Sequence, residues 1–134
     1  MFKVKVLTIG RSKESWLAEA LAEYEKRLQG KLQLEWHFAK NNPQLITWAR
    51  QEPSLIALDP KGELLTSEQF SQKIVKNSRL HFLIGGAEGI PAEIPTPIKW
   101  SLSPLTFTHQ MTRLILLEQL YRALEIEKGS AYHK

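Results

Sequence analysis

Hydrophobic and polar residues recur along the chain with two different periods, which separate strands from helices. Alternation predicts strands over 1–9 and 31–39, and compact apolar runs predict three more over 54–58, 80–84 and 98–102. Apolar residues at helical spacing predict helices over 14–29, 66–77 and 110–127, with a short helix after Asn41-Asn42-Pro43. Strands that alternate with helices predict one α/β domain over residues 1–134, with a mostly parallel five-stranded sheet and helices on both faces.

Capping and turn residues mark where these elements begin and end. Ser12 is the predicted N-cap of the first helix, and Gly30 stands where a helix commonly stops. The segment Asp59-Pro60-Lys61-Gly62 is typical of a turn, so we expect it to close the third strand.

The last helix carries more apolar surface than the outer helix of a small sheet needs. One stripe consists of Leu114, Leu117, Tyr121 and Leu124, and a second group widens it: Ile115, Leu116, Leu120 and Ala123. Two explanations are open, deeper burial within the fold and contact with a partner subunit.

Composition narrows the functional classes. The 134 residues include no cysteine, which excludes disulfides, thiolate nucleophiles and cysteine-based metal sites. No apolar run approaches the roughly 20 residues that span a bilayer, and the start of the chain does not resemble a signal peptide. The net charge of +4 permits RNA binding without establishing it. We therefore expect a cytoplasmic protein with no membrane partner.

Two loops with small residues follow predicted strands and form a candidate cofactor pocket. Gly85-Gly86 follows the strand over 80–84, and the loop over 102–107 leads into the last helix. Such loops expose backbone N–H and C=O groups to a flat polar ligand, at the edge of the sheet where ligands bind in open α/β folds. The alternative is structural: a tight glycine turn and a simple strand-to-helix connection with Ser103 or Thr108 as a cap.

The histidines and the end of the chain are the other candidates for chemistry. The four histidines lack the clustered spacing of metal ligands, so we expect no metal site. His109 lies beside the candidate pocket. The tail Ala131-Tyr132-His133-Lys134 is either frayed or functional, because its imidazole, phenol and ammonium groups can bind RNA or move a proton.

Taken together, these segments resemble a known family. The chain is similar to the RlmH family of the SPOUT class, bacterial methyltransferases that modify a pseudouridine of large-subunit ribosomal RNA. The resemblance extends over nearly the whole chain and rests on these segments: KVLTIGRSKESW, AEYEKRL, LDPKG, LIGGAEG, WSLSPLTFTHQMTR and LLEQLYRALEIEKGSAYHK.

The resemblance implies methylation of N3 of a pseudouridine in 23S rRNA on the assembled ribosome, with S-adenosyl-L-methionine as cofactor. It also implies a homodimer, no DNA partner and a C-terminal trefoil knot around the cofactor. The family's cofactor positions match Leu58, Gly85, Leu102, Ser103, Pro104, Leu105, Thr106 and Phe107, and we add Gly86. Tyr132 and His133 match the family's tail, which is expected to complete the site across the dimer with Arg122.

A mechanism follows as a hypothesis. N3 of pseudouridine carries a proton, so the enzyme must place N3 about 3–3.5 Å from the methyl carbon and supply a proton acceptor. His133 is the favoured acceptor and Tyr132 orients the base. Arg113 and Arg122 are candidates for pairing with phosphates, although Glu118 can neutralise Arg122.

The chain departs from the family pattern at two places. The region between Phe38 and Ser54 is shorter than in relatives, and Thr108 stands where relatives tend to have proline. Two other functions are compatible with the sequence. One is a non-catalytic α/β nucleotide-binding module, and the other is a ribosome-associated RNA-binding protein whose glycine turn is structural.

Overall fold

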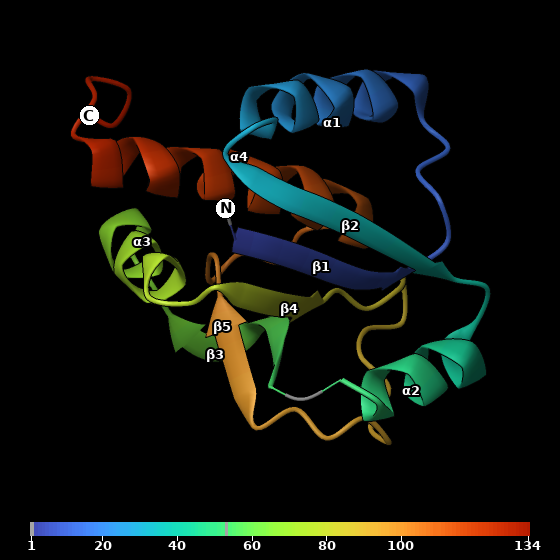
Figure 1. The fold of residues 1–134 in the computed structure, drawn as a ribbon. Helices are drawn as coiled ribbons and strands as arrows, with labels where there is room; N and C mark the ends of the chain where they lie inside the picture. The colour runs from blue at the N-terminus through green and yellow to red at the C-terminus, as the bar shows by residue number, and fades with distance from the viewer. Residues whose placement is uncertain (1, 53) are drawn as a thin grey trace.

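A five-stranded parallel sheet forms the centre of the fold (Figure 1). The computed structural model describes residues 2–52 and 54–134, so Met1, at the start of the first predicted strand, lies outside the described residues. Every strand pairing in the sheet is parallel, and the spatial order is β2-β1-β4-β3-β5. The strands are β1 (Phe2–Ile9), β2 (Leu32–Ala39), β3 (Leu55–Leu64), β4 (Arg79–Leu83) and β5 (Ile98–Ser101).

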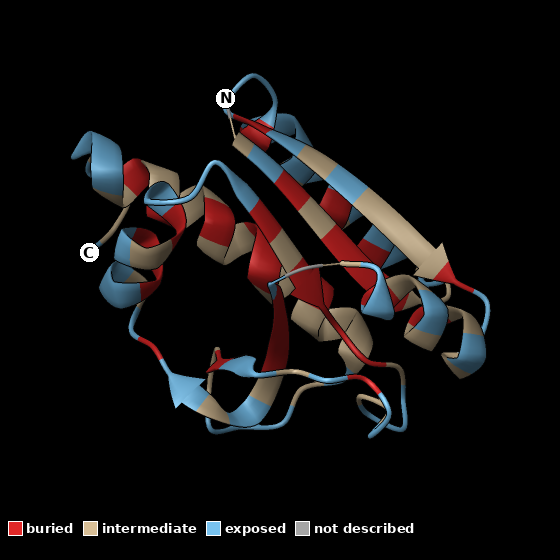
Figure 2. Cartoon of the chain, turned by 60° about the horizontal axis from the view of Figure 1, so that its bottom comes forward, coloured by how far each residue is buried: buried red, intermediate tan, exposed pale blue. Residues whose placement is uncertain are grey.

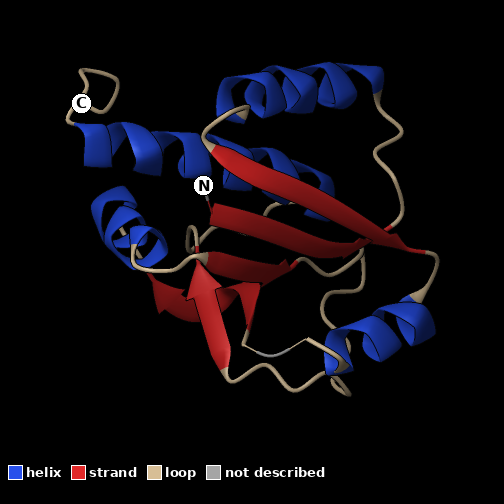
Figure 3. Cartoon of the chain, viewed as in Figure 1, coloured by secondary structure: helices blue, strands red, loops and turns tan. Residues whose placement is uncertain are grey.

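Helices cover both faces of the sheet, as predicted (Figure 3). The helices α1 (Ser15–Leu28), α3 (Ser67–Val75) and α4 (His109–Lys128) share one apolar core with the sheet, and α4 packs against both α1 and α3. The short helix α2 (Asn42–Arg50) packs on the opposite face, where its Leu45 and Ala49 share a smaller core with Leu7 and Leu83. No helix in the described ranges is both long and apolar enough to cross a bilayer.

The two cores explain the alternation seen in the sequence. Val4 and Val6 of β1 point to the three-helix side, and Leu7 points to the α2 side, so β1 is buried on both faces along its second half. Figure 2 shows buried residues concentrated on the strands and on the inner sides of the helices. Each fully buried Leu, Val or Phe side chain stabilises the fold by roughly 1.5–3 kcal/mol.

The prediction that the segment over 59–62 closes the third strand is wrong, although this segment does interrupt the pairing of the strand with β5. β3 continues to Leu64, but Leu58 and Glu63 both pair with Trp100 of β5, so residues 59–62 interrupt the register. Within this interruption, Asp59 Oδ1 accepts from the backbone N–H of Lys61, as in a turn. Pro60 is tolerated because it lies within this interruption, beyond the positions where β3 pairs with β4 and between those where it pairs with β5. Gly62 is required here, since a Cβ would lie 2.6 Å from the backbone carbonyl carbon of Lys99.

Ser12 is not the N-cap of α1, contrary to the prediction. The cap is Glu14, and its side chain makes no capping hydrogen bond. The Ser12 hydroxyl instead accepts a hydrogen bond of 3.1 Å from Nη1 of Arg113. The caps at Asn41, Thr66 and Thr108 do form, and each accepts from a backbone N–H in the first turn of its helix.

Burial within the fold accounts for much of the apolar surface of α4. Leu116, Leu117, Leu120 and Ala123 are buried among the sheet, α1 and α3. The other apolar residues of the two groups are only partly buried: Leu114, Ile115, Tyr121 and Leu124. Deeper burial is therefore one explanation of the wide apolar surface, and the partly exposed residues leave room for a partner.

The Arg113 side chain joins the start of α4 to the end of β1. Its Nη2 donates to the backbone carbonyl of Ile9 at 2.7 Å and to Thr8 Oγ1 at 3.2 Å. Its Nη1 donates to Ser12 and to Gln110, and the guanidinium lies 5.6 Å from the Phe38 ring centroid. The side chain is fully buried, and burial lowers the pKa of Arg113 to about 10.

We predict that Arg113→Lys destabilises the protein far more than Arg122→Lys, a matched change on the same helix. A lysine cannot reproduce the planar fork that serves several acceptors, so the loss should be about 2–4 kcal/mol. Arg122 is partly exposed and paired with Glu118, so its replacement should cost less than about 1 kcal/mol. Urea unfolding of the two variants measures the difference. Equally small decreases in the free energy of unfolding of the two variants would show that the Arg113 hydrogen bonds contribute little to stability.

Candidate functional site

The segments predicted to form a pocket do converge on one cleft. A cavity of about 160 Å³ lies at the end of β4 and at the point where the pairing of β3 with β5 is interrupted. The residues that line it come from four segments: Leu58, Asp59, Ile84, Gly85, Gly86, Gly89, Ile90, Phe107, His109 and Thr112. A smaller hollow of about 40 Å³ adjoins it and shares Leu58, Asp59, Phe107 and Thr112. We refer to the cavity and the hollow together as the cleft.

The glycine turn after β4 brings bare backbone to the cleft. A Cβ on Gly85 would lie 2.5 Å from the backbone carbonyl carbon of Gly89, so any side chain there would force the turn apart. Gly89 has a φ of +84° and donates from its backbone N–H to the carbonyl of Gly86 at 3.0 Å. The turn thus has a specific close-packed shape, and Gly85 is part of what sets it.

The segment before α4 supplies the other wall. The Ser101 hydroxyl donates to the carbonyl of Ser103 at 2.9 Å, and the Ser103 hydroxyl accepts from the backbone N–H of Leu105 at 3.0 Å. These bonds fold residues 101–105 into a tight loop. Among the predicted positions, Leu102, Ser103, Leu105 and Phe107 line the cleft. Pro104 and Thr106 are exposed, and Thr106 lines a neighbouring recess instead.

Thr108, which departs from the family pattern, closes this loop onto the helix. Its hydroxyl accepts from the backbone N–H of Met111 at 3.1 Å and satisfies a free donor of the first turn. A capping hydroxyl at this position therefore anchors the helix start, although it does not restrict φ as proline would.

Sequence reasoning placed His109 only beside the pocket, whereas it lines the cleft. It did not name six other residues of the cleft: Asp59, Pro60, Ile84, Gly89, Ile90 and Thr112. Asp59 follows Leu58 directly, and His109 and Thr112 lie one helical turn apart at the start of α4, so adjacency and helical spacing were the available signals. Burial, and then the charge of Arg113, lower the pKa of His109. The His109 imidazole is therefore neutral at neutral pH.

Hydrogen bonds also set the tautomer of His109. Arg113 can only donate, so Oε1 of Gln110 accepts from it at 3.3 Å, and Nε2 of Gln110 is left to donate. That amide nitrogen lies 3.2 Å from Nε2 of His109, which must accept. The proton of the neutral ring accordingly resides on Nδ1.

The cleft is suited to a cationic ligand. Asp59 is the only acidic residue among the described residues that line it, and its Oδ1 accepts from the backbone N–H of Lys61 at 2.9 Å. A carboxylate next to exposed peptide groups can stabilise a positive charge and bind hydroxyl or ammonium donors. Within the described ranges, no three His, Asp or Glu side chains group as a metal site would need.

The tail residues predicted to act with this cleft lie elsewhere in the same chain. Figure 1 shows the C-terminus beside the far end of α4, away from the arrowheads of β1 and β2. The 20 residues of α4 span about 30 Å, and the cleft lies at its first turn. The structure therefore does not bring Tyr132 and His133 to Gly85 within one chain.

A polar network holds the tail against its own chain. Tyr132 donates from its hydroxyl to Glu118 Oε2 at 2.8 Å, and Arg122 lies 4.9 Å from the Tyr132 ring centroid while also pairing with Glu118. Nδ1 of His133 accepts from Arg122 at 2.9 Å, so its Nε2 carries the proton and donates to Glu68 at 3.0 Å. Burial, and then the bond to Glu118, raise the pKa of Tyr132.

The prediction that Arg113 pairs with phosphates is wrong. The guanidinium is fully buried and already donates to four protein oxygens, so it is not accessible to RNA. Arg122 is partly exposed, and Glu118 pairs with it at 3.0 Å as its i,i+4 spacing predicted.

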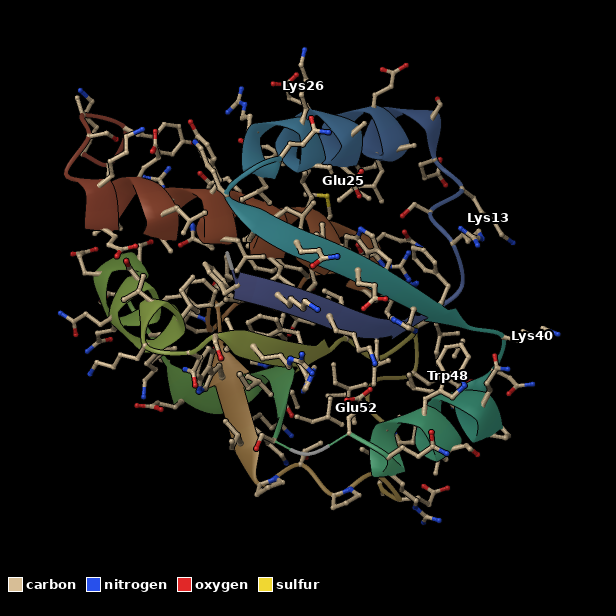
Figure 4. All side chains as sticks on the ribbon, in the orientation of Figure 1. Lys13, Glu25, Lys26, Lys40, Trp48 and Glu52 are labelled. Carbon is tan, nitrogen blue, oxygen red and sulfur yellow. The ribbon has the colours of Figure 1, made fainter. Side chains whose placement is uncertain are left out.

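A second hollow, of about 300 Å³, lies on the part of the sheet that α2 leaves uncovered. Lys3, Lys5, Glu35, Arg79 and His81 line it along three strands, together with Glu52. Glu52 follows α2 and contacts both Lys5 and His81; Figure 4 shows it between α2 and the strands. This hollow lies toward the other end of the strands and shares no residue with the cleft.

Comparison with known proteins gives one consistent result. Residues 2–133 match a sequence family described as "Predicted SPOUT methyltransferase". A protein of Protochlamydia amoebophila named Ribosomal RNA large subunit methyltransferase H is 52% identical over 140 aligned positions, which cover all of both chains. Proteins of the same name from Prochlorococcus marinus and Synechococcus sp. are 41% and 38% identical, each alignment covering 98% of this chain and 96% of the relative.

Proposed function

Because this chain belongs to the SPOUT methyltransferase family, we propose that it transfers a methyl group from S-adenosyl-L-methionine to N3 of a pseudouridine in 23S rRNA. The single observation that carries the proposal is the cleft in which the Gly85–Gly86 turn and the loop over 102–107 meet. The relatives of this chain are named as large-subunit ribosomal RNA methyltransferases, and their similarity extends over nearly the full length of this chain. We place the reaction in the cytoplasm, on the assembled ribosome, with no membrane or DNA partner.

The residues of the cleft fit S-adenosyl-L-methionine. The glycine turn and the loop of Leu102, Ser103 and Leu105 offer backbone donors and acceptors between apolar walls, which suits a flat heterocycle. Leu58 and Phe107 supply the apolar contacts, and Asp59 supplies a negative charge. When bound, the cofactor provides a methyl group activated by a positively charged sulfonium. The trefoil knot that the family resemblance implies is part of this proposal.

We assign the remaining site residues to a second copy of the chain. Tyr132 and His133 follow the far end of α4 and fold back against Glu118 and Arg122 of their own chain, and neither lines the cleft. The partly exposed apolar residues of α4 provide a surface for a homodimer contact. In such a dimer, the tail of one copy reaches the cleft of the other. A dimer also doubles the basic surface that a +4 chain offers to RNA.

The tail contacts assign distinct roles to its residues. The raised pKa of Tyr132 keeps its hydroxyl protonated at neutral pH, so it can orient a base but cannot accept the N3 proton. His133 is then the proton acceptor. Its Nδ1 lone pair is held by Arg122, so Arg122 positions the ring and must release this contact before His133 accepts a proton.

We predict that Gly85→Ala abolishes binding of S-adenosyl-L-methionine in a protein that still folds. The added methyl group would lie 2.5 Å from the backbone of Gly89 and would force the turn out of the cleft. Gly10→Ala is the matched control: Gly10 has a φ of +71° and open space around its Cβ position, so it incurs backbone strain without touching the cleft. Titration calorimetry measures the affinity of both variants for S-adenosyl-L-methionine. Unchanged affinity in Gly85→Ala would contradict the assignment of the cleft.

The activity is tested with methyl-labelled cofactor and ribosomes that lack the modification. We expect label in 23S rRNA, located at N3 of one pseudouridine by mass spectrometry. We expect little label in free pseudouridine-containing RNA, because the small net charge gives weak affinity for bare RNA and docking to a folded ribosomal site provides the remaining affinity. Cofactor binding without any label would favour the non-catalytic nucleotide-binding module. Ribosome association without cofactor binding would favour the RNA-binding module.

The same assay tests whether the tail acts in trans. Gly85→Ala and His133→Ala should each be inactive alone. After co-expression and random pairing, half of the dimers contain one copy of each variant. Such a dimer has one of its two sites intact, formed by the unchanged cleft of one copy and the unchanged tail of the other. About a quarter of normal activity should therefore return. If the tail acts on its own chain, no activity returns. Full turnover by His133→Ala alone would end its role as the proton acceptor.

A further inference from the structure

Trp16 is an exposed aromatic side chain with no role in the site described so far. It lies in the first turn of α1, and 53% of its surface is accessible. A tryptophan exposed to this extent presents a large apolar area that is accessible to a ligand or partner. Its neighbours therefore indicate what it contacts.

Trp16 borders a recess of about 550 Å³ that continues from the cleft. Gly86, Gly89, Phe107 and His109 line both the cleft and the recess, so the two spaces meet at these residues. The recess has its own further lining: Glu14, Trp16, Ala87, Thr106, Thr108, Gln110 and Met111. Its volume is within the roughly 300–1,000 Å³ of a small-molecule site.

The residue types in the recess suit an uncharged base better than a phosphate. No lysine or arginine is among the described residues that line it, and Glu14 is the only charged one. Trp16, Phe107 and Met111 offer apolar surface, and the two threonines and Gln110 carry hydrogen-bonding groups. Single-stranded RNA is read by this combination, in which a base stacks on an aromatic ring and polar groups bind its edge.

We propose that the recess is the subsite for the target nucleobase, with Trp16 as its stacking platform; this inference rests on the proposed methyl transfer. The transferred methyl carbon must lie about 3–3.5 Å from the accepting atom, so an unstacked pyrimidine must occupy space directly beside the cofactor. The recess is such a space, and it shares four residues with the cleft. Trp16 is a positioning and binding residue in this account and takes no part in proton transfer.

The test compares Trp16→Leu, Trp16→Phe and a control, Trp48→Leu, in steady-state methylation of ribosomes. Trp48 lies on α2, on the opposite face of the sheet. Loss of the aromatic ring should raise KM for ribosomes about tenfold or more, because stacking of one base on an aromatic ring strengthens binding by about that factor. Trp16→Phe should recover most of this loss. Affinity for S-adenosyl-L-methionine, measured by calorimetry, should be unchanged in every variant.

Three results would overturn the proposal. A wild-type KM in Trp16→Leu would show that the ring does not contact the substrate. Dissociation of the dimer by the same change, seen in sedimentation equilibrium, would show that a second copy covers the recess. Weakened cofactor binding would place Trp16 in the cofactor site. If the unaltered protein transfers no label to ribosomes, the proposed function fails together with this inference, whereas the first three results leave the proposed function intact.

Discussion

The fold around the cleft depends on one buried cation. Arg113 donates to the end of β1, to Ser12 in the following loop and to Gln110 in the first turn of α4. Its charge is unpaired by any acidic side chain in the described residues, and its lowered pKa reflects the cost of burial. The protein offsets that cost with hydrogen bonds to the charged group, each worth roughly 1.5–3 kcal/mol. Because these bonds fix the start of α4, they also fix Phe107, His109 and Thr112 in the cleft.

The sheet and α4 together separate the two halves of the proposed site. The carboxyl end of β4 and the position where β3 stops pairing with it lie at one edge of the sheet, and Leu58 and the glycine turn lie there. A helix of 20 residues then carries the chain about 30 Å away before the tail begins. The tail folds back only as far as Glu118 and Arg122, so the site that we propose takes its tail residues from a second copy. Such an arrangement would couple activity to assembly, since the monomer holds His133 in contacts with Arg122 and Glu68.

Local patterns predicted the elements well because periodicity and caps are local properties. Asn41 and Thr66 cap their helices as their residue types indicate. The errors involve contacts between segments distant in sequence. Ser12 has the residue type of a cap, but Arg113, 101 positions later, takes its hydroxyl. The segment over 59–62 has the composition of a turn and does interrupt the register, but pairing with β5 resumes at Glu63 and extends the strand. Likewise, composition alone cannot show that Arg113 is buried, or that Trp16 borders the recess beside the cleft.

The most direct measurement of the central claim is hydrogen–deuterium exchange of the protein with and without S-adenosyl-L-methionine. The cleft assignment predicts slower exchange of the backbone amides over residues 84–90 and 102–109, because bound ligand holds these segments closed. It predicts no comparable change on the open part of the sheet around Lys3 and Arg79. Cofactor binding that leaves both segments unprotected, or that protects the open sheet instead, would contradict the account.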